Sequence, residues 1–130
     1  MSYAMTVRLS APFAPTVERV RTALKDQGFG VLTEIDMRST LRDKLGVDMA
    51  EYVILGACNP ALAHRAVQAD PAIGLLLPCN VVVRADGADS TVVQAMDPQV
   101  MVQLSDAPEL PAIADEAAGR LREALATLPA

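Results

Sequence analysis

The sequence predicts an α+β fold, a single-domain two-layer sandwich in which helices pack on one side of a largely antiparallel sheet. Stretches with strand and helix patterns follow one another, and no internal repeat or linker divides the chain. A short turn around Gly87 joins two of the strands, and such a hairpin requires antiparallel pairing. We therefore treat residues 1–130 as one domain with its core in residues 5–125, a length that suffices for a single hydrophobic core.

The first third of the chain is predicted to be strand, helix, strand and short helix. Residues 3–9 alternate apolar and polar side chains, which is typical of a half-buried strand. Residues 14–27 have apolar side chains at spacings of three and four, and Gly28 provides the helix stop. A second alternating stretch covers residues 29–37, and a short helix is predicted over residues 39–45.

The rest of the chain adds three strands and three helices. Residues 52–58 are apolar on both faces, so we expect an interior strand that is covered on both sides. Asn59 and Pro60 then begin a helix that runs to residue 69, because Asn is a favoured N-cap and Pro suits the first helical position. Further strands are predicted at residues 79–84 and 91–96, and helical stretches at residues 98–104 and 110–128.

The composition excludes several classes of function. The net charge is −5 and the isoelectric point is about 4.7, whereas a protein that binds nucleic-acid phosphates is normally basic. Only 3% of the residues are aromatic, so a surface on which single-stranded bases stack is also missing. No apolar run is long enough to span a membrane, and the N-terminus does not resemble a signal peptide. We expect a cytoplasmic protein without nucleic-acid or membrane partners.

The dipeptide Cys-Asn occurs twice, each time at the edge of a predicted strand. Cys58-Asn59 closes the strand over residues 52–58, and Cys79-Asn80 opens the strand over residues 79–84. If these strands are antiparallel neighbours, both units lie at the same end of the sheet, whereas parallel strands would place them at opposite ends. The helix between them is compatible with either arrangement.

Several segments together resemble one protein family. They are residues 28–36, residues 45–48, both Cys-Asn units, and Asp97-Pro98 with Met101. From about residue 5 to residue 125 the pattern resembles the domain-of-unknown-function 302 (DUF302) family. The resemblance implies a β-α-β(4)-α domain grouped with the TATA-box-binding-protein-like fold, often a homodimer, and no established activity. The relation to a DNA-binding fold carries no function here, because function depends on the site and this chain is acidic.

The Cys-Asn units supply four candidate ligand-binding residues. Cys58 is predicted to precede a helix N-terminus, which favours a reactive thiolate, although a free cysteine is more often a small buried hydrophobic residue. The same two interpretations apply to Cys79. Asn59 is explained as a helix cap, whereas Asn80 either satisfies loop backbone groups or faces a ligand.

Glu34 is the fifth candidate. Glu34 and Asp36 alternate on one face of their predicted strand, opposite Val31 and Thr33. Two carboxylates that point into one space can perform acid–base chemistry, although a solvated sheet face is the commoner explanation.

No metal site is predicted. Such a site requires about four convergent ligands, and the sequence contains no C-x-x-C motif. The single histidine, His64, falls on the polar face of its predicted helix, and only the tertiary fold could bring it to Cys58, Cys79 and a methionine such as Met96. We therefore predict neither a metal nor a cofactor.

The apolar segment of residues 74–78 has no periodicity, so its leucines must be covered either by the helical layer or by a second subunit. We expect a homodimer, with the last helix as the competing surface. The leading hypothesis is a small binding or accessory domain with a ligand pocket where the Cys-Asn units converge. The alternative is a thiol-dependent redox or metal-linked enzyme that uses Cys58, with Cys79 as the resolving thiol.

Overall fold

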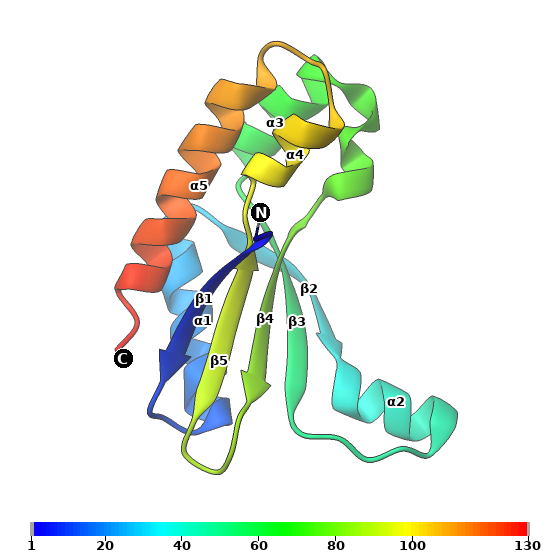
Figure 1. The fold of residues 1–130 in the computed structure, drawn as a ribbon, viewed down its shortest axis with the longest axis vertical. Coiled ribbons are helices and arrows are strands. Elements are labelled where there is room, and N and C mark those ends of the chain that lie inside the picture. The colour runs from blue at the N-terminus through cyan, green and yellow to red at the C-terminus, as the bar shows by residue number, and fades with distance from the viewer. Residues whose placement is uncertain (1, 130) are drawn as a thin grey trace.

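A computed structural model describes residues 2–129 and contains one five-stranded sheet with helices packed on it (Figure 1). The strand order is β1-β5-β4-β3-β2, and every neighbouring pair is antiparallel, so the predicted α+β class is confirmed. The elements in chain order are β1 (Ala4–Leu9), α1 (Phe13–Asp26), β2 (Gly30–Asp36), α2 (Met37–Leu45), β3 (Tyr52–Cys58), α3 (Pro60–Ala69), the 3-10 helix η1 (Pro71–Leu76), β4 (Cys79–Ala85), β5 (Thr91–Met96), α4 (Gln99–Leu104) and α5 (Leu110–Ala126).

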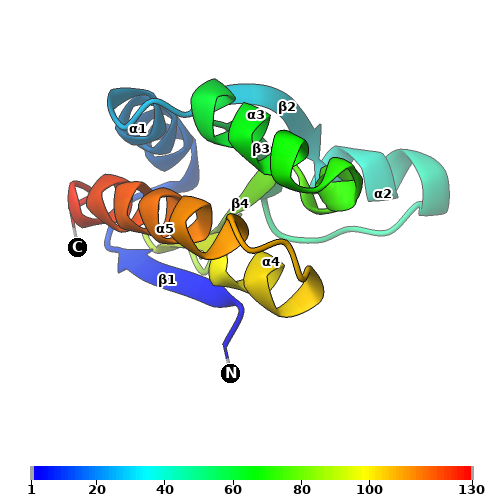
Figure 2. The same cartoon turned by 90° about the horizontal axis from the view of Figure 1, so that it is seen from above.

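The helices cover one face and one end of the sheet. Helices α1 and α5 run along the same face and pack against each other, whereas α3, η1 and α4 form a cap beyond one end of the strands (Figures 1 and 2). The other face of the sheet carries no helix of the described residues (Figure 1). Without the cap and α2, the order of elements is β-α-β(4)-α.

The hydrophobic core consists of two clusters. The larger lies between the sheet and helices α1 and α5, with Leu24, Leu55 and Leu121 among its fully buried members. The smaller lies inside the cap and includes Ile73 and Met101. Because α5 contributes buried residues to both clusters, it connects the cap to the sheet.

Strand β2 departs from the expected alternation. A bulge between Val31 and Thr33 shifts its register, so that Val31 pairs with Ala57 and Thr33 pairs with Gly56 of β3. Val31 packs against the larger core cluster, on the face opposite Thr33, and the expectation that these two residues share a face is wrong. The physical reason is the extra residue, Leu32, because strict alternation assumes a strand without a bulge.

Helix α2 begins earlier than predicted and projects from the body of the protein (Figure 1). The Asp36 carboxylate accepts a hydrogen bond from the Ser39 backbone N–H at 2.9 Å, which caps a helix that starts at Met37. Gly46 ends the helix with a φ of 68°. None of the nine residues of α2 is buried, which distinguishes it from α1, α3 and α5.

Strand β3 lies inside the sheet, between β4 and β2, but is covered on one face only. Val53, Leu55 and Ala57 are buried under the helices, whereas Tyr52 and Ile54 on the other face are half-buried. The expectation of cover on both faces is therefore wrong for the described residues. The strand is apolar on both sides because its uncovered face also carries apolar side chains, such as Tyr52 and Ile54.

The cap covers most of the apolar segment that follows α3. Ile73 is buried, and Leu76 and Leu77 pack against the cap cluster. Leu75 alone among these leucines points into solvent, with 88% of its surface exposed.

Candidate functional site

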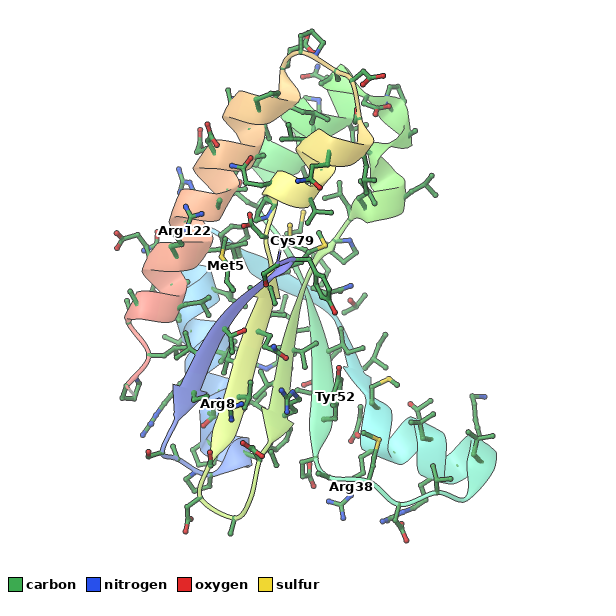
Figure 3. All side chains as sticks on the ribbon, viewed as in Figure 1. Met5, Arg8, Arg38, Tyr52, Cys79 and Arg122 are labelled. Atoms are coloured by element: carbon green, nitrogen blue, oxygen red, sulfur yellow. The ribbon has the colours of Figure 1, made fainter. Side chains whose placement is uncertain are left out.

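The structure brings both Cys-Asn units to the same end of the sheet. Strands β3 and β4 are antiparallel neighbours in which Ala57 pairs with Cys79 and Gly56 pairs with Asn80. This is the arrangement in which the end of one strand meets the start of the next. Figure 3 shows Cys79 at this end, directly beneath the cap.

A small cavity of about 30 Å³ lies where the two core clusters meet. Its wall includes Cys58 and Asn59 from the end of β3, Cys79 from the start of β4, and Met101 from α4. The rest of the wall is apolar and comes from β3, α3, α5 and the segments just before β2 and β4. The space suffices for a few small atoms, whereas pockets for metabolite-sized ligands measure about 300–1,000 Å³.

Asn59 acts as the N-cap of α3, as predicted from the sequence. Its Oδ1 accepts a hydrogen bond from the Leu62 backbone N–H at 3.2 Å. Its Nδ2 is close to Gly28, since a Cβ added to this glycine would lie only 3.0 Å from Nδ2. The φ of Gly28 is +84°, a backbone conformation that favours glycine. The capping bond and this close approach hold the Asn59 side chain at the rim of the cavity.

The two thiols differ in their surroundings. Cys79 is only 7% exposed, whereas Cys58 is half-buried, and both cysteines are free. Burial raises the pKa of the Cys79 thiol to about 11, and the nearby Cys58 thiol contributes to the same shift. Cys79 is therefore protonated at neutral pH and is a poor nucleophile without a partner that displaces its proton.

Asn80 and Glu34 lie outside the cavity. Asn80 is exposed on the uncovered sheet face, in a groove of about 550 Å³ that also includes Tyr52 and Gln94. Glu34 is on the helix-covered face, where its carboxylate forms an ion pair with Arg21 at 2.6 Å. The cavity thus unites three of the five candidates, Cys58, Asn59 and Cys79.

Met101 is the member of the site that the sequence did not identify as a candidate. It is 3% exposed and lies in α4, a helix of six residues that the sequence indicated only as a helical stretch. The local pattern of such a short helix does not distinguish a cavity wall from an ordinary core position, and the one signal at Met101 was its place in the pattern that resembles the DUF302 family. Its role depends on how the cap folds back over β3 and β4.

Charged and histidine side chains do not converge on this site. Within residues 2–129, no group of three or more His, Cys, Asp or Glu side chains is arranged to hold a metal ion. His64 is exposed on α3 and does not line the cavity. Any ligand here must therefore be recognised by sulfur atoms, the amide of Asn59 and apolar contacts.

Some curated relatives of this chain are longer proteins. The fluoride-specific ion channel FluC 1 of Brucella suis biovar 1 and its namesake in Brucella abortus biovar 1 are each 30% identical over 100 residues. The match covers 76% of this chain but only 39% and 36% of those proteins, so the chain spans less than two fifths of their length. In the described part of the chain, no helix has both the length and the apolar character needed to cross a membrane.

Two further comparisons cover nearly the whole chain. The crystal structure of an uncharacterised conserved DUF302 protein from Bacillus stearothermophilus matches with a TM-score of 0.88 and 32% sequence identity, over 97% of this chain and 98% of that chain. Residues 5–128 match the family model described as a domain of unknown function, DUF302. The chain therefore belongs to the DUF302 family.

Proposed function

We propose that this protein is a small cytoplasmic binding domain whose site is the cavity between the sheet and the cap. The observation that carries the proposal is the meeting of Cys58, Asn59 and Cys79 at one apolar cavity. A charged metabolite would lose its hydration there without gaining a counter-charge, because no charged side chain among residues 2–129 lines the wall. The ligand class that fits is a very small apolar solute or a soft ion.

The rival function, a thiol-dependent enzyme, has weaker support. A resolving thiol must reach the thiolate state, and the raised pKa of Cys79 opposes this. Labelling of Cys58 with a thiol reagent across pH separates the two functions. An apparent pKa well below about 8.5 for Cys58 would favour the enzyme, and sluggish labelling that needs denaturant would favour the binding domain.

The Brucella relatives support an accessory role. In those proteins, a region similar to this chain forms only part of a longer polypeptide. This is the arrangement expected of a domain that serves a neighbouring activity. Ion conduction, which the names of those relatives describe, is not part of the proposal for this chain.

An apolar cavity of this kind is tested with xenon, which binds dry apolar cavities. We expect xenon to shift the methyl NMR resonances of Leu62, Met101 and Ile113, since all three line the cavity. The variant Ala66→Leu fills the space from α3 and should abolish these shifts. Ala61→Leu, which adds the same side chain at an exposed position of α3, is the matched control. Absent shifts, or shifts that persist in Ala66→Leu, would contradict the proposal.

The second part of the proposal is a homodimer through the α2 patch, which we define as Leu32, Ile35, Leu45 and Val47. These side chains are 69%, 45%, 70% and 43% exposed, and they belong to or flank β2 and α2. A nine-residue helix is marginal in water unless an apolar face is packed, and α2 has no buried residue. A second copy of the chain supplies the missing contacts.

Charge also favours self-association at this patch. Two copies with a net charge of −5 repel each other over most of their surfaces. Residues 37–48 instead carry three basic side chains, Arg38, Arg42 and Lys44, and two acidic ones, Asp43 and Asp48. Arg38 and Arg42 already form ion pairs with Glu51 and Asp48 of the same chain. A two-fold interface can still pair Lys44 of each copy with Asp43 of the other reciprocally.

Light scattering coupled to size-exclusion chromatography tests the homodimer. We expect the wild type to have the mass of a dimer and Leu45→Asp to have the mass of a monomer. Leu75→Asp, at the more exposed leucine of η1, should remain dimeric. A monomeric wild type would refute the homodimer, and a monomeric Leu75→Asp variant would move the interface to the cap.

A further inference from the structure

We propose that the cavity binds one Cu(I) ion through the sulfur atoms of Cys58, Cys79 and Met101. The inference rests on the proposed function of the cavity as a binding site and names its ligand. The three residues come from the end of β3, the start of β4 and helix α4, and all of them line the same 30 Å³ space. Residues that carry two thiols and one thioether therefore line one space, although they come from separate parts of the sequence.

The donor set selects the metal. Thiolate and thioether sulfur are soft ligands, which favour Cu(I), whereas Mg²⁺ and Ca²⁺ require several oxygen ligands. A structural Zn²⁺ site uses four Cys, His or carboxylate ligands, and residues 2–129 contain no cluster of even three such side chains. Cu(I) is the common biological ion that fits a site with two thiols and a thioether.

The surroundings suit a small monovalent cation. The volume of the cavity leaves room for an ion but not for a hydrated divalent cation or an organic cofactor. Cys79 and Met101 are 7% and 3% exposed, so the bound ion would be shielded from water, and the half-buried Cys58 offers a route of entry. Shielding matters because Cu(I) in water is readily oxidised or captured by other thiols.

Charge balance can be written explicitly. Cu⁺ and two thiols give a bis-thiolate complex with a net charge of −1, and two protons pass to solvent without any electron transfer. The residual negative charge would lie just before the N-terminus of α3, a ten-residue helix whose dipole stabilises an anion there. The thioether of Met101 adds a neutral third ligand and leaves this balance unchanged.

The test is an anaerobic titration of reduced, metal-free protein with Cu(I) in competition with bicinchoninate, whose Cu(I) complex is coloured. We expect the wild type to withdraw one equivalent of Cu(I) from the chelator. Cys58→Ser and Cys79→Ser should each weaken binding by about 100-fold or more, and Met101→Leu by about 10-fold. Met96→Leu is the matched control, because Met96 lies in the groove on the uncovered face and should bind as the wild type does.

A second measurement avoids any dependence on the folding of the variants. X-ray absorption of the wild-type complex should show copper surrounded by sulfur alone. Nitrogen or oxygen ligands, no withdrawal of Cu(I) by the wild type, or full retention by Cys79→Ser would overturn the proposal. If xenon enters the cavity but Cu(I) is not retained, the ion is wrong while the binding cavity stands. If neither binds, both proposals fail.

Discussion

The two Cys-Asn units have the same sequence and the same place along the sheet, yet their side chains meet different environments. In the first unit, Cys58 ends β3 and Asn59 caps α3, so both residues line the cavity. In the second, both residues belong to β4 and therefore point to opposite faces of the sheet. Cys79 is buried beneath the cap, whereas Asn80 faces the uncovered side.

A repeated dipeptide therefore does not define a repeated site. At a strand end, the chain turns into a helix and adjacent side chains can face the same space. Within a strand, the pleat separates adjacent side chains by geometry alone. The cavity is therefore built from one whole unit, half of the other, and Met101 from an unrelated helix.

The largest change in stability is expected for a substitution at Gly56. This residue pairs with Asn80, so the substitution tests the packing around the second Cys-Asn unit. A Cβ at this position would lie 2.1 Å from Thr33 Oγ1 and 2.8 Å from Pro78 Cγ. Because the Pro78 ring cannot rotate away, Gly56→Ala should lower the free energy of unfolding by about 3 kcal/mol, as measured by urea denaturation. Adding Thr33→Ala should recover part of the loss, and unchanged stability in Gly56→Ala would show that this register is incorrect.

The next largest effect is the pH dependence of the free energy of unfolding, to which the two cysteines should contribute differently. The unfolded Cys79 thiol loses its proton above about pH 9, while the folded one keeps it until about pH 11, because burial raises its pKa. The unfolded state is therefore favoured as the pH rises through this window. The free energy of unfolding of the metal-free protein should fall by about 2–3 kcal/mol more in the wild type than in Cys79→Ala.

Cys58→Ala is the control for this measurement. Burial is the larger cause of the Cys79 shift and the Cys58 thiol the smaller one, so most of the pH-dependent loss should persist in this variant. The other ionisable side chains are common to the wild type and Cys79→Ala, so the difference between these two curves isolates Cys79. Parallel pH curves for the wild type and Cys79→Ala would contradict the buried position of Cys79.

Much of the fold was predictable because each strand and helix has a local pattern. Alternation identified β1, the Asn-Pro pair identified the start of α3, and Gly87 identified the β4–β5 turn. The bulge at Leu32 was not predictable, because an inserted residue leaves the same composition as a regular strand. Its consequence is that Val31 joins the covered face while Thr33 does not.

The candidate site was predictable only in part. Cys58, Asn59 and Cys79 lie near strand ends, where the sequence placed them, but Asn80 was expected to accompany Cys79. The alternation of a strand already argues against that pairing. Glu34 is held by Arg21 of α1, a tertiary contact that no local pattern reveals, and Met101 reaches the cavity only through the fold of the cap.

The smallest expected effect compares the two asparagines directly. Asn59→Ala removes the side-chain oxygen that accepts the Leu62 N–H bond, and loss of an N-cap costs about 1 kcal/mol. Asn80 is exposed on the uncovered face near the cap end of the sheet, where a substitution to Ala should change stability by less than about 0.5 kcal/mol. Urea denaturation of the two variants at neutral pH measures both values under the same conditions.

The asparagine pair also tests whether the cavity depends on its rim. If Asn59 holds the start of α3 against Gly28, Asn59→Ala should lower the xenon-induced shifts at Leu62 as well as the stability, because Leu62 lies in the first turn of that helix. Asn80→Ala should leave those shifts unchanged, because its side chain is on the other face of the sheet. Equal effects of the two substitutions would mean that the two units are equivalent after all, in conflict with the alternation of β4.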